Sequence, residues 1–308
     1  MILFTDLDGT LLTDSKELTK ENQDAIREAI EAGHKVVIST GRPLAGATAQ
    51  AHALHLDGKG CYIICFNGGE IYDCAARKSL YRKCVPFDEV RYVFDLAHKR
   101  GLHIQTYDRN HVIGEENRKE IFDYSSVYGL PAKIVPDVIS CLPEEPCKML
   151  AIDEENHENL VRFQKELLPW AEGKLDLFFS HPMLLELVPT GVSKGAAIGI
   201  LCDYLGIPIS EAVAVGDGVF FIQDGIDRAR DRLAVGDVHA ALLVDIQPQK
   251  PLAALADVFH VPQRASVRAH DGLGKFRDLL CDLHKTILSH KKEWGPNPHS
   301  PVNYDQNA

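Results

Sequence analysis

The sequence lacks any hydrophobic run long enough to cross a membrane. Its most apolar window, residues 61–66, is far shorter than the roughly 18–20 residues that a transmembrane helix needs. The first residues, Met1 to Asp6, lack the basic start and the apolar stretch of about 7–15 residues that mark a secretory signal peptide. We therefore expect a cytoplasmic protein that neither spans nor binds a membrane.

Positive charge is also scarce. The 308 residues include 33 lysines and arginines against 44 acids, which gives a formal net charge of −11. Such a chain has no broad basic surface for non-specific binding to nucleic acids or to membranes. A local basic pocket can still bind a small anion. The sequence does not indicate the oligomeric state.

The eight cysteines include no Cys-x-x-Cys pair. A chain of this length buries enough apolar surface to fold without disulfides. We therefore interpret the cysteines as reduced thiols, most of them buried.

What the sequence does contain is an alternation of short apolar strands and helices. A strand over 2–5 is followed by a helix with Thr19 as its N-cap, which ends at Gly33 before a second strand over 35–39. Strand, helix and strand in this order predict a right-handed parallel crossover. The same alternation predicts a helix over 43–55, a strand over 62–66, a helix over 194–205 and a strand over 212–215. The fold class is thus α/β, with a doubly wound, mainly parallel sheet.

The pattern of apolar and polar residues changes between residues 83 and 187. Here the pattern predicts helices over 87–100, 116–128 and 155–168 and strands over 103–107, 148–152, 175–180 and 183–188. We interpret this part as an inserted α+β domain. The split domain around it comprises residues 1–82 and 188–290, and residues 291–308, rich in proline and asparagine, are predicted to be a disordered tail.

The strongest chemical signal is the pair Asp6 and Asp8, directly after the first strand. The carboxyl ends of strands in an open parallel sheet face the ligand crevice, so these carboxylates are expected to meet substrate. A structural alternative is a turn in which the acids cap a helix.

Three more polar segments follow other predicted strands or begin a helix. Thr40 and Gly41 offer a hydroxyl and backbone N–H groups that suit a phosphate oxygen. Lys194 begins a helix, where its ammonium can neutralise anionic oxygens, and Asp217 supplies another acid at the same edge of the sheet. Taken alone, a solvated lysine explains Lys194 equally well.

Together, these segments resemble the phosphatases of the haloacid dehalogenase superfamily, Cof-type branch. The resemblance is carried by Asp6-x-Asp8-Gly9-Thr10, Ser39-Thr40-Gly41-Arg42-Pro43, Asn67-Gly68-Gly69, Gly191-Val192-Ser193-Lys194-Gly195 and Gly216-Asp217-Gly218. It implies a Rossmann-like core and identifies the inserted domain as the cap of that branch.

The resemblance also implies a reaction. Asp6 would attack phosphorus to form an aspartyl-phosphate, and Asp8 would act as general acid and base. A Mg²⁺ ion would be held by Asp6, Asp8 and Asp217. The residues expected to bind phosphate or substrate are Thr40, Gly41, Arg42, Asn67 and Lys194, although Arg42 could instead be a routine salt-bridge partner. The substrate would be a small phosphorylated metabolite such as a sugar phosphate.

The sequence departs from the family pattern after Asp217. Phe220 and Phe221 stand where the family has Asn and Asp, and residues 222–233 are rich in charge where an apolar segment is expected. Three accounts remain open: a working phosphatase, a weakened paralogue that binds phosphometabolites, or a frameshifted reading of 219–233, which resequencing of codons 215–236 tests. A phosphomutase with a similar cap is a further, less favoured alternative.

Overall fold

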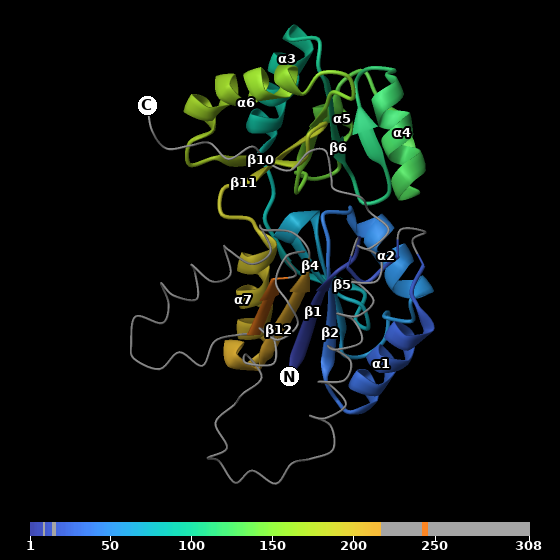
Figure 1. Cartoon of the computed structure of the whole chain (residues 1–308). Helices are drawn as coiled ribbons and strands as arrows, with labels where there is room; N and C mark the ends of the chain where they lie inside the picture. The colour runs from blue at the N-terminus through green and yellow to red at the C-terminus, as the bar shows by residue number, and fades with distance from the viewer. Residues whose placement is uncertain (9, 14–16, 217–241, 246–308) are drawn as a thin grey trace, which may run out of the picture.

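The computed structural model describes residues 1–8, 10–13, 17–216 and 242–245. They form two sheets, and Figure 1 shows one sheet with its helices above the other. Asp217, the altered segment after it and the expected tail lie outside the described residues. Within the described ranges, no helix has the length and apolar character needed to cross a membrane.

The lower sheet has seven strands in the order β13-β12-β1-β2-β3-β4-β5. Their bounds are β1 (Ile2–Asp6), β2 (Lys35–Ser39), β3 (Cys61–Cys65), β4 (Glu70–Asp73), β5 (Lys78–Arg82), β12 (Ala212–Gly216) and β13 (Leu242–Asp245). The pairs from β13 to β3 are parallel, whereas the β3–β4 and β4–β5 pairs are antiparallel, so β4 alone runs opposite to the other strands of this sheet. This arrangement confirms the α/β fold with a mainly parallel sheet.

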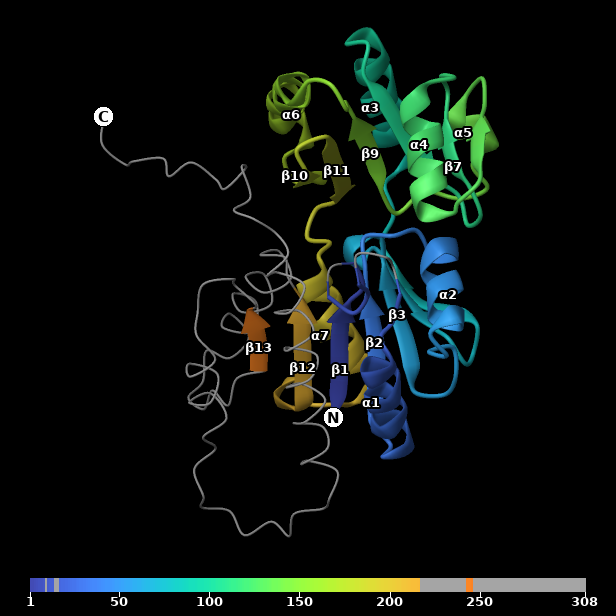
Figure 2. The same ribbon diagram turned by 45° about the vertical axis from the view of Figure 1, so that its right-hand side comes forward.

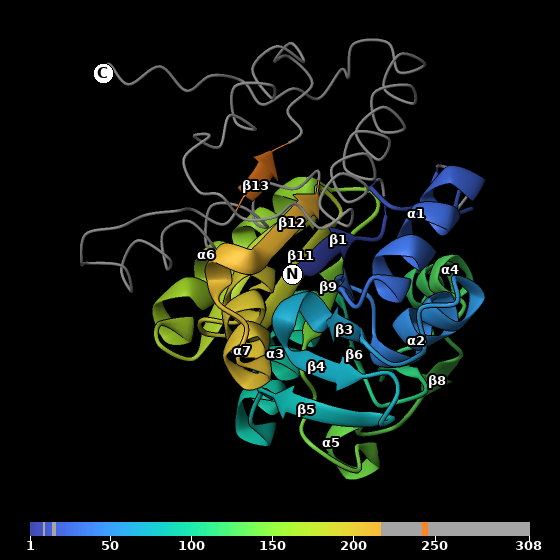
Figure 3. The ribbon, with the colours of Figure 1, turned by 90° about the horizontal axis from the view of Figure 1, so that it is seen from below.

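Helices cover both faces of the lower sheet, as Figures 2 and 3 show. They are α1 (Lys20–Glu31), α2 (Leu44–Ala53) and α7 (Lys194–Leu205). Because side chains alternate along a strand, Leu3 of β1 packs in the cluster that contains α1 and α2, whereas Ile2 and Phe4 pack with α7. The expected N-cap of α1 is present, because Asn22 N–H donates to Thr19 Oγ1. α7 ends at Gly206, which has the left-handed conformation.

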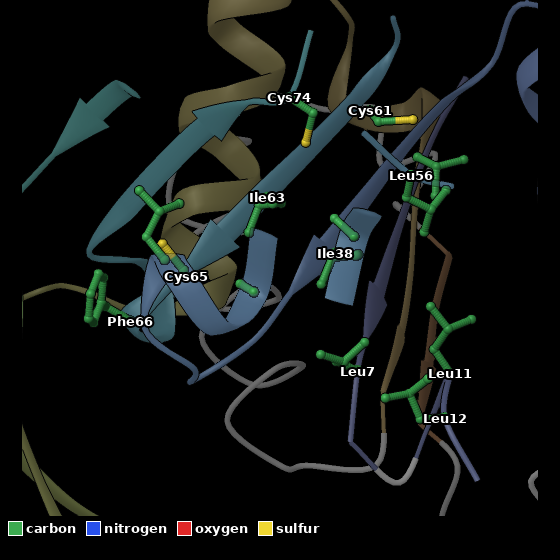
Figure 4. Packing of buried hydrophobic residues seen from close by; sticks show 14 of the residues in the cluster. Leu7, Leu11, Leu12, Ile38, Leu56, Cys61, Ile63, Cys65, Phe66 and Cys74 are labelled. Atoms are coloured by element: carbon green, nitrogen blue, oxygen red, sulfur yellow. The ribbon is translucent and has the colours of Figure 1, made fainter. Parts of the chain in front are cut away.

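Figure 4 shows the apolar packing of the α1 and α2 side of the sheet, where Leu7, Ile38 and Ile63 belong to one buried cluster. All seven described cysteines are free thiols, and five of them are buried. Burial raises the pKa of Cys74 in this cluster to about 12. Most of the described cysteines therefore behave as small apolar side chains.

The upper sheet has six strands in the order β10-β11-β9-β6-β7-β8, and only its β7–β8 pair is parallel. Its strands are β6 (His103–Tyr107), β7 (Val112–Gly114), β8 (Ala132–Ile134), β9 (Met149–Ile152), β10 (Leu175–His181) and β11 (Leu184–Pro189). Its helices are α3 (Phe87–Lys99), α4 (Lys119–Tyr128), α5 (Val138–Cys141) and α6 (His157–Ala171). α3, α5 and α6 pack in one apolar cluster, while α4 packs in the cluster that also contains α1 and α2.

The predicted helices of this region correspond to α3, α4 and α6, although α6 continues through Pro169 to Ala171. Sequence reasoning did not predict the strands β4, β5, β7 and β8. β5 lies at the edge of the lower sheet, and none of its residues is fully buried, so it carries no strong apolar pattern.

The buried His103 of β6 predicts a pH dependence of stability. Burial lowers the pKa of His103, whose Nε2 lies 3.0 Å from Gln105 Oε1. Below the ordinary histidine pKa of about 6.5, the unfolded chain takes up a proton that the folded chain resists, so stability falls as the pH falls through this range. Between about pH 7.5 and pH 5, we expect this residue to account for about 1 kcal/mol of lost unfolding free energy.

Urea unfolding at the two pH values measures this loss. The variant His103→Gln should lose less stability on acidification than the wild type. His55→Asn, at an exposed position with a φ of 56° that asparagine also adopts, is the matched control and should retain the wild-type loss. Equal losses for all three proteins would contradict the assignment.

Candidate active site

The two predicted carboxylates lie at the end of β1. Asp6 is the last residue of that strand, is 8% exposed and pairs in register with Ser39 of β2. Its Oδ1 lies 2.5 Å from Lys194 Nζ, although 188 positions separate the two residues in the chain. A partly buried ion pair thus joins the motif that begins at Asp6 to the motif Gly191–Gly195, which contains Lys194.

Lys194 reaches Asp6 because α7 begins very close to the turn after β3. This turn is the short helix η1 (Phe66–Gly68), in which Gly68 has φ +107°. A Cβ on Gly68 would lie 2.2 Å from the carbonyl oxygen of Ser193, the N-cap of α7. Glycine is therefore required at position 68 for both conformation and space.

Asp8 is paired with Arg42. Arg42 Nε donates to Asp8 Oδ2 at 2.8 Å and Nη2 donates to Oδ1 at 2.6 Å, and the guanidinium is 5% exposed. Burial lowers the pKa of Arg42, but the hydrogen bonds and charge of Asp8 outweigh burial and raise it above its ordinary value. The structure thus shows Arg42 as an ion-pair partner, and its contact with substrate stays a prediction.

Thr40, Gly41 and Asn67 form a compact pair of loops beside these carboxylates. Asn67 N–H donates to the Thr40 carbonyl at 3.1 Å, and a Cβ on Gly41 would lie 2.7 Å from Asn67 Oδ1. Asn67 has a left-handed backbone, with φ 57°. Its buried Nδ2 has no hydrogen-bond partner within the described chain. An unsatisfied buried donor is costly, so this amide suits an oxygen atom supplied by a ligand.

The donors present fit a divalent cation. Asp6 and Asp8 offer the hard oxygen ligands that Mg²⁺ prefers. β12 pairs with β1, and Val215 lies opposite Thr5. The expected ligand Asp217 is the next residue in the sequence after β12, which ends at Gly216. Asp217 lies outside the described residues, and within them no group of three His, Cys, Asp or Glu side chains is placed to hold a metal.

Sequence reasoning missed a buried lysine that forms an ion pair within the upper region and a hydrogen bond to the lower one. Lys148, 2% exposed, donates from Nζ to the Gly41 carbonyl at 2.9 Å, and the same Nζ lies 2.8 Å from Glu186 Oε2. Lys148 precedes β9 and Glu186 lies in β11, so the upper sheet contacts the loop that carries Thr40 and Arg42. The available signal was a lysine and a glutamate within two predicted apolar strands, where charges are rare unless paired.

The upper region also contributes an aromatic ring. The Arg42 guanidinium carbon lies 5.4 Å from the centre of the Tyr128 ring, at the end of α4. Burial raises the pKa of Tyr128, and the negative charge of Asp8 raises it further. Asp8, Arg42 and Tyr128 therefore form one interacting set across the two regions.

The close approach at Gly68 predicts a large effect of one methyl group. Gly68→Ala should lower the free energy of unfolding by about 3 kcal/mol, because the new Cβ meets the Ser193 carbonyl in an already strained backbone. Gly173→Ala is the matched control: its φ is also positive, at +72°, but the added Cβ meets no atom of the described chain within 4 Å. We expect it to cost about 1 kcal/mol in urea unfolding. Equal costs would show that the contact with Ser193 is unimportant.

Comparisons with known proteins agree with this arrangement. The family model for haloacid dehalogenase-like hydrolases matches residues 3–219. An inferred phosphatase of Streptococcus pyogenes is 32% identical over 224 residues, which cover 70% of this chain and 80% of that protein. The 5-amino-6-(5-phospho-D-ribitylamino)uracil phosphatase YcsE of Bacillus subtilis is 28% identical over 71% of this chain and 77% of its own length.

A solved structure shares the fold. The haloacid dehalogenase-like hydrolase from Bacteroides thetaiotaomicron superposes with a TM-score of 0.68 and 27% identity, covering 73% of this chain and 85% of that chain. The family match spans β1, η1, the start of α7 and β12, which are the elements that build the site. The chain therefore belongs to the haloacid dehalogenase-like hydrolases, in their Cof-type branch.

Proposed function

We propose that this hydrolase releases phosphate from small phosphorylated metabolites, with Asp6 as its nucleophile. The observation that carries the proposal is the pairing of Asp6 with Lys194 at the carboxyl edge of the parallel sheet, two residues before Asp8. A carboxylate held beside a fixed cation can approach a phosphate dianion with reduced repulsion.

The proposed reaction has two displacements. An Asp6 carboxylate oxygen forms a bond to phosphorus while the bond from phosphorus to the ester oxygen breaks, and Asp8 gives its proton to the departing alkoxide. Asp8 then takes a proton from water, which attacks the phosphorus and releases Asp6. The bidentate contact with Arg42 orients Asp8 and occupies both of its carboxylate oxygens, so Arg42 would release one of them when Asp8 carries the proton of the first step.

Charge on the transferring oxygens would be balanced by this chain's own groups and by a cation. Lys194, the Thr40 hydroxyl, the Gly41 N–H and the Asn67 amide would contact those oxygens. Mg²⁺ would be held by Asp6, the Asp8 backbone carbonyl and Asp217. When bound, it supplies charge neutralisation between the nucleophile and the phosphate.

We further propose that residues 83–187 act as the cap over a core of residues 1–82 and 188–290. The contact of Lys148 with the Gly41 carbonyl supports this, because it places the upper sheet against the loop that carries Thr40 and Gly41. Water would be excluded from the site when the two parts close. The relative YcsE is a phosphatase of a phosphorylated ribitylamino compound, which supports a sugar phosphate or similar metabolite as substrate. The net charge of −11 supports a protein with no nucleic-acid partner. We also propose that it acts in the cytoplasm.

Removal of divalent metal tests the proposal. Phosphate release from a generic aryl phosphate should fall by at least about a hundredfold after treatment with a chelator and should return when Mg²⁺ is added back. Release is measured as inorganic phosphate over time, with buffer alone as the background. A rate that the chelator leaves unchanged would overturn the Mg²⁺-dependent reaction.

A non-catalytic phosphometabolite-binding protein is the second candidate, because Phe220 and Phe221 replace polar residues of the family motif. Calorimetric binding of a sugar phosphate without phosphate release would favour it. A screen of phosphorylated metabolites on the purified protein separates the two candidates and identifies the substrate.

A further inference from the structure

Two cysteines meet where the lower sheet connects to the upper one. Cys84 lies in the segment between β5 and α3, and Cys147 lies just before β9. Their Sγ atoms are 3.7 Å apart, although 63 positions separate them in the chain. A disulfide bond is about 2.0 Å long, so the two sulfurs need to approach by less than about 2 Å.

Cys84 occupies the position at which the chain passes from one sheet to the other. Before it, Lys83 N–H donates to the Gly69 carbonyl at 2.9 Å, beside the lower sheet. After it, Val85 N–H donates to the Pro146 carbonyl at 2.7 Å, next to the upper sheet. Lys83 Nζ also donates to the Thr190 carbonyl on the second connection, at 2.6 Å. A covalent bond at Cys84 would therefore act on the junction itself.

Cys147 is packed against the lower sheet. Cys147 is 2% exposed, and a Cβ added to Gly69 would lie 3.0 Å from the Cβ of Cys147. Cys147 thus has a fixed position, whereas Cys84 is only half-buried and can be reached by a small oxidant.

The surroundings make Cys84 the more reactive thiol. The hydrogen bond with Cys147 lowers the pKa of Cys84, burial opposes this effect, and the positive charge of Arg82 supports it. Arg82 Nη2 also lies 3.7 Å from Cys147 Sγ. In contrast, burial raises the pKa of Cys61 and Cys74. The structure therefore places a half-buried thiol that loses its proton more readily than an ordinary cysteine next to a second thiol that can resolve it.

We propose that Cys84 and Cys147 form a reversible disulfide that restrains the connection between the two sheets. With hydrogen peroxide as oxidant, the Cys84 thiolate attacks one peroxide oxygen, the O–O bond breaks and hydroxide leaves, so that Cys84 becomes a sulfenic acid. The Cys147 sulfur then attacks the Cys84 sulfur. The S–O bond breaks, and the oxygen leaves as water with the Cys147 proton. A low-molecular-weight dithiol supplies the two electrons that restore both thiols.

Peptide mapping of the full-length protein tests the bond. The protein is treated with a small excess of hydrogen peroxide, its remaining thiols are alkylated, and it is digested without reductant. We expect a peptide pair joined through Cys84 and Cys147 that disappears after reduction. Cys84→Ser should abolish this pair, and Cys74→Ala, which removes a buried thiol of the lower sheet, should leave it intact.

Hydrogen exchange tests the restraint and does not depend on phosphatase activity, so it stands or fails apart from the proposed function. In the oxidised wild type, the backbone amides of residues 83–85 should exchange at least about tenfold more slowly than in the reduced protein. Oxidised Cys84→Ser should exchange like its own reduced form. If both cysteines are still alkylated after oxidation, their thiols are free and the proposed disulfide has not formed. A cross-link that leaves the amide exchange of residues 83–85 unchanged would overturn the restraint.

Discussion

Asp6→Asn should reduce phosphate release under saturating Mg²⁺ by at least about a thousandfold. An amide of the same shape cannot form the aspartyl-phosphate, so the reaction loses its nucleophile. Because the Asn side chain still offers an oxygen to Lys194, the contact now made at 2.5 Å has an acceptor and the fold should be retained. Single-turnover measurement of phosphate release gives the size of the loss.

Asp95→Asn is the matched control, because it makes the same chemical change at an exposed position of α3. It should leave release at the wild-type rate. Circular dichroism and urea unfolding of both variants exclude a folding defect as the cause. If Asp6→Asn releases phosphate as fast as the wild type, Asp6 is not the nucleophile and the proposed reaction fails.

Lys148→Met should lower the free energy of unfolding by about 3–5 kcal/mol. The substitution leaves the carboxylate of Glu186, which is 5% exposed, without its cation 2.8 Å away. It also removes the hydrogen bond to the Gly41 carbonyl, which connects the upper sheet to the loop that carries Thr40 and Gly41. Urea unfolding measures the loss, which we expect to be the largest stability effect among the variants considered.

Lys119→Met provides the matched control. Lys119 also pairs with carboxylates, Asp123 at 3.0 Å and Glu154 at 2.8 Å, but its side chain is 74% exposed. Solvent screens such a pair, and the expected cost is below about 1 kcal/mol. The double variant Lys148→Met/Glu186→Leu should recover much of the stability, since apolar residues can replace a buried ion pair. Similar losses for Lys148→Met and Lys119→Met would contradict this account.

The elements that place the carboxylates could be predicted because their signals are local. An apolar run followed by acids predicted β1 and the position of Asp6, and Thr19 and Gly33 marked the two ends of α1 through their own capping chemistry. The strands β7 and β8 were missed because each has only three residues, too few for a periodic pattern.

The partners of the site residues could not be predicted in the same way. Arg42 was expected to contact substrate, and the sequence allowed a salt bridge equally well. The structure shows two hydrogen bonds to Asp8, 34 positions away. Lys148 was an ordinary residue of a predicted strand until the fold placed it 2.9 Å from the Gly41 carbonyl, 107 positions away.

The sequence by itself determined the order of most strands and helices, the acidic charge balance and the motifs that resemble one family. These properties depend on residue types and on spacings of a few positions. Only the tertiary structure decided that Lys194 pairs with Asp6, that Arg42 pairs with Asp8 and that Cys84 meets Cys147. The reason is physical: these contacts form when distant segments pack together, and the free energy of that packing depends on the whole core rather than on any local pattern.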